Sequence, residues 1–454
     1  MSTISLANCQ RFTGGRWLVE PADVEKRVSI ESDSRKDCSK ALFIAFEGER
    51  FDAHDFVEAV IDKGASAVCV HKKSESLLLE KAKTAGIAIL LVEDTIKAYQ
   101  DLATGKLSES DCTVIGITGS SGKTSVKAIL SQMLESAAQG QVLSTIANTN
   151  NHIGVPQNVL RLEDHHKYAV IEMGTNNPGE IAVLAQCAPP DFAVITSIGD
   201  SHSGNFPENG ILYEKSDIIK HMKEDALAII PEELKGKIQS TGVLEGRDFL
   251  TFGIAGTGVY ADYVCGTLDG AELVIEGKEV KTSLSGRHQA QNISACMTVM
   301  KQLGFELDDY LGSLGRLELP GMRMKIQEEQ GVTWVNDAYN ANPQSMLAFI
   351  EWLRDIPGIV KNYKNRFLVL GDMLELGDNS LSFHEEVVES IPGNWKIIGV
   401  GENFCSAAKG EFPTFIDSES ASEFICRKIQ AGDLVALKAS RGIKLEEIYK
   451  KFTN

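Results

Sequence analysis

The segment T-G-S-S-G-K-T at residues 118–124 combines glycines, a lysine and a hydroxyl side chain in an order suited to phosphate chemistry. A common phosphate-binding loop has glycine, any four residues, and then Gly-Lys-Ser/Thr. Counting back five from Gly122 reaches an isoleucine, so this loop closes more tightly than that pattern. Lys123 could reach the β- and γ-phosphates of a nucleoside triphosphate, and the Thr124 hydroxyl could bind Mg²⁺. An ordinary strand-to-helix turn is the alternative interpretation.

The residues on either side of the loop supply the strand and the helix that such chemistry requires. Residues 113–118 form an apolar run typical of a buried strand, and residues 123–134 have helical spacing. The start of a helix offers free N–H groups and the positive end of its dipole to a bound phosphate. The expected nucleotide-binding residues of the loop are Gly119, Ser120, Ser121, Gly122, Lys123, Thr124 and Ser125.

Short apolar runs alternate with helical patterns along most of the chain, which predicts an α/β fold. The runs are continuous, as in parallel strands covered on both faces; they lie at 65–70, 87–92, 113–118, 168–173, 192–198 and 226–231. Residues 250–285 alternate instead and contain Asp-Gly and Glu-Gly turns, which predicts a small antiparallel insert. We expect three domains, at residues 1–109, 110–318 and 319–454.

The composition excludes several classes of function. The chain has 454 residues and a formal charge of −18, which argues against a broad nucleic-acid surface. Its nine cysteines form no C-x-x-C pair, so a zinc site or a redox dithiol is not expected, and reduced thiols suit a cytosol. The N-terminus does not look like a signal peptide, and the apolar runs are too short to span a bilayer. We therefore expect a cytoplasmic protein that neither binds nucleic acid nor inserts into a membrane.

The loop form T-G-[Ser/Thr]-x-G-K-T-[Ser/Thr] resembles that of the Mur ligases, the ATP-dependent amide-forming enzymes of peptidoglycan synthesis. Two further strings are similar to the same family, D-A-Y-N-A-N-P-x-S-M at 337–346 and V-L-G-D-M-x-E-L-G at 369–377. The resemblance runs from about residue 32 to the C-terminus. It implies an N-terminal domain that binds a UDP-linked precursor, a central P-loop ATPase domain, and a Rossmann-like C-terminal domain.

The resemblance also implies a reaction. The expected activity joins D-alanyl-D-alanine to UDP-N-acetylmuramoyl-tripeptide through an acyl phosphate, with ATP and two Mg²⁺ ions, in a monomer. A related muramoyl ligase or a folylpolyglutamate-type ligase is an alternative. The Asp-Asn-Pro-Arg motif of the sister enzyme that adds the third amino acid is absent from the sequence. A P-loop switch protein that uses ATP hydrolysis only to move is the alternative from another class.

The resemblance assigns binding roles to residues outside the loop. Residues in the segment 32–56 would hold the UDP-linked precursor, and those in the Asn-rich segment 147–160 would bind substrate or a metal-bound water. Residues near 288–292 would contact adenine, and two residues of the third domain would close over ATP. The expected substrate-binding residues are Ser34, Arg35, Thr149, Asn150 and Asn151, and the further ATP-binding residues are Asn292, Arg323 and Asp337.

A metal site is expected beside the loop. Glu172 ends a buried apolar strand, and an acid in that place commonly supports Mg²⁺ on the phosphates, although an ordinary glutamate is the alternative. The family resemblance adds His202 and Lys215, the latter matching a lysine that CO₂ converts to a metal-binding carbamate. By its pattern alone Lys215 would be a helix-surface lysine. The expected catalytic set is Lys123, Glu172, His202 and Lys215, and the metal ligands are Thr124, Glu172, His202 and Lys215.

Overall fold

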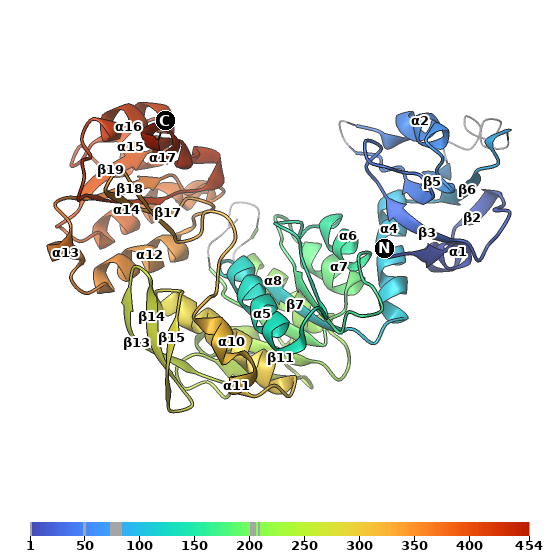
Figure 1. Cartoon of the computed structure of the whole chain (residues 1–454), viewed down its shortest axis with the longest axis horizontal. Helices are drawn as coiled ribbons and strands as arrows, with labels where there is room; N and C mark the ends of the chain where they lie inside the picture. Colours follow the sequence, from blue (N-terminus) through green and yellow to red (C-terminus); the bar gives the residue numbers. More distant parts are fainter. Residues whose placement is uncertain (1, 49–50, 73–83, 200–205, 208, 454) are drawn as a thin grey trace. The chain divides into compact units, whose positions relative to one another are not determined.

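The structure is a computed structural model that describes residues 2–48, 51–72, 84–199, 206–207 and 209–453 (Figure 1). His202 lies outside these described residues. By its internal contacts the chain divides into two units: Met1–Gly116 with Gly140–Met173 and Val183–Pro190, and Ile117–Gln139 with Gly174–Ala182 and Asp191–Asn454. The three domain boundaries expected from the sequence stay a prediction.

The N-terminal part of the first unit is a six-stranded sheet of order β1-β3-β4-β5-β6-β2 (Figure 1). The neighbours β3 to β6 pair in parallel, and the outer strands β1 and β2 pair antiparallel. All five residues of β6 are buried, as expected for a strand covered on both faces. The strands are β1 Ile4–Ser5, β2 Arg16–Val19, β3 Arg27–Glu31, β4 Ala41–Ile44, β5 Ala67–His71 and β6 Ala88–Val92, and the helices are α1 Leu6–Thr13, α2 Val57–Asp62 and α4 Thr95–Ser108.

A second six-stranded sheet has the order β12-β11-β10-β7-β9-β8. The pairs β10–β11, β11–β12 and β8–β9 are parallel, as the continuous apolar runs predict. Strand β7, Thr113–Thr118, leads through the glycine loop into α5, Lys123–Ala138. The other strands are β8 Val142–Ser144, β9 Tyr168–Glu172, β10 Phe192–Ile195, β11 Leu227–Pro231 and β12 Asp248–Phe252, and the helices are α6 Gly154–Val159, α7 Glu180–Cys187, α8 Gly210–Lys220, α9 Lys235–Gln239, α10 Arg287–Gln302 and α11 Leu307–Leu314.

The expected antiparallel insert is present in the second unit. Strands β13 Ala261–Thr267, β14 Gly270–Ile275 and β15 Lys278–Thr282 form a three-stranded sheet with antiparallel pairing. The two residues between β14 and β15 are Glu276, with φ of 48°, and Gly277, with φ of 80°. Positive φ at both positions is typical of the tight hairpin turn whose twist matches that of the strands.

The C-terminal sheet has the order β16-β17-β21-β18-β19-β20, with only β16 antiparallel among the pairs described. Successive residues of β21 face opposite sides: Leu434 and Ala436 join the core under α12 and α14, and Val435 and Leu437 join the core under α16 and α17. Helices therefore cover both faces, as expected for a Rossmann-like sheet. The strands are β16 Lys325–Glu329, β17 Val332–Asp337, β18 Arg366–Gly371, β19 Lys396–Val400, β20 Thr414–Phe415 and β21 Leu434–Lys438, and the helices are α12 Pro343–Asp355, α13 Ile359–Asn362, α14 Ser380–Ser390, α15 Glu402–Ala407, α16 Ser418–Cys426 and α17 Glu446–Thr453.

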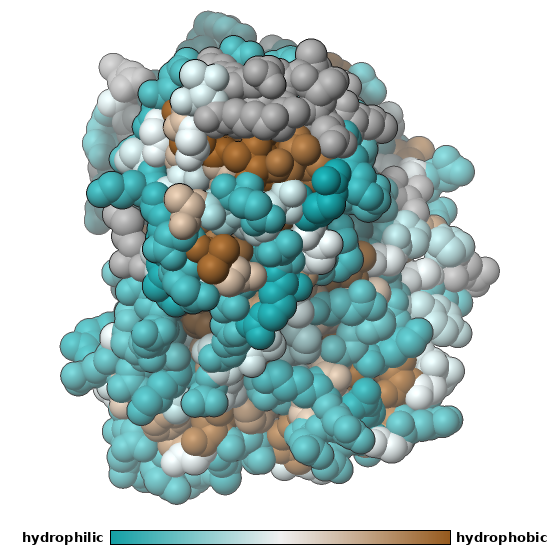
Figure 2. All heavy atoms as spheres, turned by 90° about the vertical axis from the view of Figure 1, so that its right-hand side faces the viewer, coloured by the Kyte–Doolittle hydropathy of each residue, from teal (hydrophilic) through white to brown (hydrophobic). Residues whose placement is uncertain are grey.

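Figure 2 shows a face that is mostly hydrophilic, with a brown area beside residues drawn in grey. Within the ranges that the structure describes, no helix has the length and apolar character needed to cross a membrane.

Candidate functional site

The two glycines of the phosphate loop stand where a side chain would collide with neighbouring atoms. A Cβ at Gly119 would lie 2.0 Å from Thr196 Oγ1. A Cβ at Gly122, whose φ is +84°, would lie 2.9 Å from Asn292 Oδ1. Glycine is therefore required at both positions because neighbouring side chains approach the backbone closely. At Gly122 the left-handed backbone conformation also favours glycine. The helix α5 begins directly afterwards at Lys123, so its free N–H groups face the loop.

The segment after β10 forms hydrogen bonds with the loop. The Ser120 amide donates to the Ser197 carbonyl at 2.9 Å, and the Ser121 amide donates to Ser197 Oγ at 2.8 Å. Ser197 Oγ in turn donates to the Ser121 carbonyl at 3.1 Å, and the Gly199 amide donates to Ser120 Oγ at 3.0 Å. The sequence analysis missed this support. The polar string T-S-I-G directly after an apolar strand was the available signal.

A cavity of about 410 Å³ lies beside the loop within the second unit. It brings the loop together with residues of α10, of the segment before β16, and of the ends of β17 and β21. The expected residues Asn292, Arg323 and Asp337 all line it, which places three distant parts of the sequence around one space. The other lining residues that matter for the site are Thr196, Ser197, His288, Gln289, Tyr339, Asn340, Asn342 and Lys438.

Arg323 extends toward the loop. Its guanidinium carbon lies 3.7 Å from the centre of the Tyr339 ring, a cation–π contact that orients the planar group. Its Nη2 donates to Thr124 Oγ1 at 3.2 Å, and its Nη1 donates to the Pro320 carbonyl at 2.9 Å. Arg323 is thus a positioned positive charge beside the residue expected to bind Mg²⁺.

Asp337 contacts protein groups that hold the Arg323 segment. Its Oδ2 accepts from Lys438 Nζ at 2.5 Å, and its Oδ1 accepts from the Met324 amide at 3.1 Å. The Lys438 and Asp337 side chains are 4% and 14% exposed, so the pair is largely desolvated. Burial lowers the pKa of the nearby His288 to about 4, against the opposing effect of Asp337, so its imidazole is neutral at pH 7.

Lys215 is buried, with 1% of its surface exposed, and the interpretation of a helix-surface lysine is wrong. Burial and the charge of Lys123 together hold the pKa of Lys215 well below its usual range, while Glu214 opposes the shift. Glu214 is itself buried and accepts from the Gly179 amide at 2.6 Å, the Ile181 amide at 2.8 Å and Thr175 Oγ1 at 3.0 Å. These bonds connect α8 to the residues around the start of α7.

In the first unit, Glu172 ends β9 with only 1% of its surface exposed. Its Oε1 accepts from Asn150 Nδ2 at 2.9 Å, and its amide donates to Thr145 Oγ1 at 3.0 Å. The structure therefore brings together two expected residues, a metal ligand and a substrate ligand. The interpretation of Glu172 as an ordinary exposed glutamate is wrong.

The Asn-rich loop is held by a residue that the sequence analysis missed. Asn158 is 1% exposed, and its Nδ2 donates to the Thr149 carbonyl at 3.0 Å and to the Gly154 carbonyl at 2.7 Å. Its Oδ1 accepts from the Ile146 amide at 3.0 Å. Asn151 Oδ1 accepts from the Gly154 amide at 2.8 Å, so Asn151 supports the start of α6. A polar residue on the apolar face of a short helix was the available signal for Asn158.

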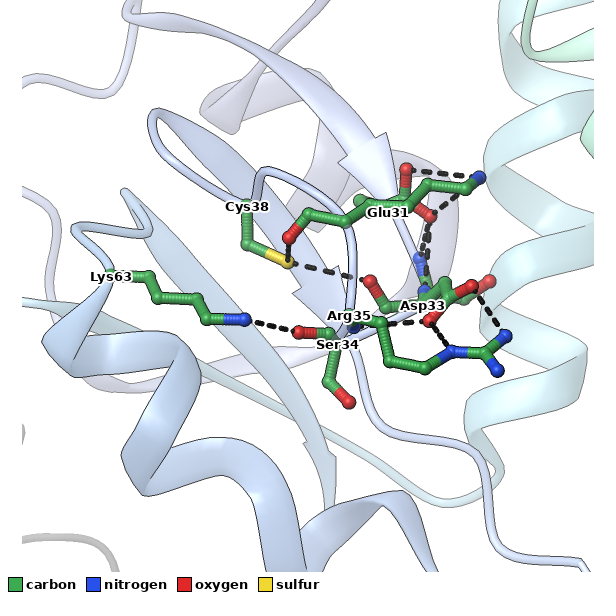
Figure 3. A network of polar contacts seen from close by, with 8 residues as sticks. Glu31, Asp33, Ser34, Arg35, Cys38 and Lys63 are labelled. Carbon is green, nitrogen blue, oxygen red and sulfur yellow. Dashed lines mark hydrogen bonds and ion pairs between the residues drawn. The ribbon is translucent and has the colours of Figure 1, made fainter.

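Ser34 and Arg35 lie in the turn after β3 (Figure 3). Arg35 Nε and Nη2 each donate to Asp33 at 2.8 Å, and these bonds hold the pKa of the Asp33 carboxyl well below its usual range. Lys63 Nζ donates to the Ser34 carbonyl at 2.6 Å. The Arg35 side chain is 88% exposed, so its guanidinium is accessible to a ligand.

The donors expected for Mg²⁺ are oxygen atoms of the right kind. The Thr124 hydroxyl and the Glu172 carboxylate are hard oxygen donors, which Mg²⁺ prefers together with substrate phosphates. Among the residues that the structure describes, no group of three or more His, Cys, Asp and Glu side chains could hold a metal ion. Each of these two side chains therefore offers the kind of oxygen that Mg²⁺ takes when phosphates supply further ligands.

Three family models match consecutive parts of the chain. The match to the Mur ligase family, catalytic domain, covers residues 28–107; that to the Mur ligase middle domain covers 117–300; that to the Mur ligase glutamate ligase domain covers 322–441. A UDP-N-acetylmuramoyl-tripeptide–D-alanyl-D-alanine ligase of Bacillus subtilis is 36% identical over 440 residues, 93% of this chain and 92% of the relative. The chain belongs to the Mur ligase family. The corresponding ligase of Escherichia coli is 31% identical over 436 residues, 93% of each chain.

Solved structures of this family have the same fold. A crystal structure of MurF from Acinetobacter baumannii matches with a TM-score of 0.88 at 29% identity, covering 99% of each chain. MurF from Thermotoga maritima in complex with ADP matches with a TM-score of 0.81 at 31% identity, covering 94% of this chain and 97% of that one. The predicted family and the α/β fold with three-domain Mur ligase architecture are confirmed. The roles of individual site residues stay predictions.

Replacing Gly119 with alanine tests the tight geometry of the loop. The added Cβ would lie 2.0 Å from Thr196 Oγ1, so the loop has to move. Displacing catalytic groups by about 1 Å can cost on the order of 10²-fold in rate, and we expect a loss of ATP turnover of that order. Gly304→Ala is the control, because Gly304 has a positive φ of +84° with nothing within 4 Å of the added Cβ. Normal ATP turnover by Gly119→Ala would show that the loop is not tightly constrained.

Proposed function

We propose that this chain is an ATP-dependent ligase that joins D-alanyl-D-alanine to UDP-N-acetylmuramoyl-tripeptide. The observation that carries the proposal is the cavity in which the phosphate loop meets Arg323, Asn342 and Lys438. A P-loop alone supports many activities. The third-domain residues around the same cavity support a ligase, and the relatives named for this reaction align over almost the full chain.

The electrostatics of the cavity suit the first step of such a reaction. A carboxylate and a triphosphate repel each other, so the step needs preorganised positive charge in a dry site. Lys123, Arg323 and the N-terminus of α5 supply it. Bound Mg²⁺ would add charge at the β- and γ-phosphates, and Thr124 and Glu172 are the proposed protein ligands.

The proposed chemistry has two steps. The terminal carboxylate of the tripeptide attacks the γ-phosphorus of ATP, the bond to the bridging oxygen breaks, and ADP leaves with that oxygen. The amine of D-alanyl-D-alanine then attacks the acyl-phosphate carbonyl, loses a proton, and expels phosphate. Excluding water protects the acyl phosphate, and we assign this role to Arg323, which donates to Thr124 Oγ1, and to the Asp337–Lys438 pair, which lines the same cavity.

The second metal ligand set is part of the proposal. Burial of Lys215 and repulsion by the positive charge of Lys123 both disfavour the charged form of Lys215. Reaction of the neutral Lys215 amine with CO₂ releases a proton and gives a carbamate, which replaces a repelled cation by oxygen donors. We assign the carbamate, Glu172 and His202 to a second Mg²⁺ ion.

Precursor recognition is assigned to the first unit. Ser34 and Arg35 would bind the uridine diphosphate, with the exposed Arg35 guanidinium suited to a phosphate. Thr149, Asn150 and Asn151 would bind the substrate or a metal-bound water. The proposed enzyme is a cytoplasmic monomer. Its nine cysteines are free thiols, and one unit holds the whole described nucleotide cavity.

An ADP-release assay tests the function against its alternatives. With UDP-N-acetylmuramoyl-tripeptide and ATP present, we expect sustained ADP release only when D-alanyl-D-alanine is added, with one amide formed per ADP. Single amino acids in place of the dipeptide should give little product, and glutamate with folate substrates should give none. ADP release that does not depend on an amine would favour a P-loop switch, and a preference for one amino acid would favour a related ligase.

Lys123→Ala tests the charge on the transferred phosphate. Removing one preorganised donor typically costs 10²- to 10³-fold in kcat, and we expect a loss of about that size. The affinity for the UDP-linked precursor should stay unchanged, because the proposed uridine diphosphate ligands lie in the other unit. Normal turnover in the variant would contradict the role of Lys123.

Lys215→Ala tests the carbamate. We expect almost no amide formation, and partial recovery when a short carboxylic acid such as acetate is added, because its oxygens can replace those of the carbamate. Wild-type activity lost on removing CO₂ should return when bicarbonate is added, because the lowered pKa of Lys215 favours the neutral amine that reacts with CO₂. The exposed Lys220→Ala on the same helix is the control. Full activity of Lys215→Ala would refute the assignment.

A further inference from the structure

The side chain of Asn342 begins helix α12. Its Oδ1 accepts from the Ser345 backbone amide at 2.8 Å, and the backbone amide of Asn342 donates to Ser345 Oγ at 3.0 Å, so the two residues form a capping box. Asn342 is followed by Pro343 at the first helical position, where a proline fits well. The oxygen of the Asn342 carboxamide therefore caps α12, the helix that covers one face of the C-terminal sheet.

The other end of the same carboxamide contacts the phosphate loop. Asn342 Nδ2 donates to Ser121 Oγ at 2.9 Å and approaches the Ser120 carbonyl at 3.4 Å. The side chain is buried, with 4% of the residue exposed, so these bonds are shielded from water. The partners are 221 residues apart in the chain. This contact directly joins the helix to the loop expected to hold the nucleotide.

Ser121 is held from two sides. Its amide donates to Ser197 Oγ, and its hydroxyl oxygen accepts from Asn342. A serine hydroxyl that accepts one bond can still donate its own proton. In this structure the Ser121 hydroxyl lies 3.2 Å from Asn342 Oδ1 and can donate to it. Because Ser121 lines the same cavity as Lys123 and Thr124, a phosphate bound there would compete with Asn342 for that proton.

We propose that Asn342 is a positioning residue that couples α12 to the phosphate loop and thereby aligns Ser121 for the nucleotide. The inference rests on the proposed ligase function for its effect on turnover, but its effect on nucleotide affinity does not depend on the acceptor. Aspartate or serine caps a helix about as well as asparagine does. Neither carries an N–H donor beside its capping oxygen, whereas a carboxamide has both an acceptor and a donor. The cap and the coupling can therefore be separated by substitution.

Asn342→Ser is the principal test. It keeps a capping hydroxyl but removes the donor to Ser121, so Tm should stay close to that of the wild type. The net free energy of one hydrogen bond corresponds to a change of about three- to tenfold in an equilibrium or rate constant. We expect kcat and the affinity for a non-hydrolysable ATP analogue each to fall by that factor. Asn342→Asp should lose more, because its carboxylate would repel the phosphates.

A double-substitution cycle links the effect to Ser121. Ser121→Ala should cause a similar loss, and Ser121→Ala with Asn342→Ser should lose no more than the worse single variant. The control is Asp417→Ala, which removes the cap of α16, where Asp417 accepts from the Ser420 amide at 2.8 Å. That variant should lower Tm without changing kcat or nucleotide affinity.

The outcomes separate this inference from the function itself. If Asn342→Ser has wild-type kcat and nucleotide affinity while Asn342→Ala only lowers Tm, Asn342 is a helix cap and the inference is overturned. Additive losses in the cycle would overturn it as well. If the wild type forms no amide with the dipeptide but Asn342→Ser still binds the ATP analogue more weakly and non-additively with Ser121→Ala, the coupling stands and the proposed ligase reaction fails.

Discussion

Gathering positive charge beside the phosphate loop is the constraint on which this site depends. The chain carries a net charge of −18, yet Lys123 and Arg323 line one cavity, and Lys215 is near enough to Lys123 for that charge to lower its pKa. Arg323 and Lys215 are held differently. Arg323 stacks on Tyr339 and reaches Thr124, whereas Lys215 is buried and its pKa is lowered. Arg323 therefore stays available as a positive charge for a phosphate, whereas burial disfavours the charged form of Lys215.

The tightness of the loop follows from its surroundings. Thr196 lies where a side chain at Gly119 would be, and Ser197 exchanges two hydrogen bonds with Ser121. These contacts leave no room for the longer approach of the common phosphate-loop pattern. The start of the loop departs from the common phosphate-loop sequence, and the segment after β10 packs against it at that place. The loop and this segment must therefore be compatible with each other in shape for the loop to bind a phosphate.

The sequence predicted the elements well, because strand burial and helical spacing are local properties. The run at 113–118 is strand β7, and the Glu-Gly pair at 276–277 is a hairpin turn. The contacts that define the site are not local. Asn342 meets Ser121 across 221 residues, and the pattern of α8 gives no sign that Lys215 faces inward. Motif resemblance pointed to Lys215 and Arg323, whereas Asn158 and Ser197 belong to no pattern used and were missed.

The expected site residues are divided between the two units. The described nucleotide cavity is formed entirely by residues of the second unit, and Ser34, Arg35, Asn150 and Glu172 belong to the first. In each unit the expected groups are held by neighbouring polar side chains: Arg35 by Asp33, Asn150 by Glu172, and the phosphate loop by Ser197 and Asn342. Preorganisation reduces the entropy lost on binding. Under the proposed function, a defect in the expected residues of one unit should therefore leave ligand binding by the other unit intact.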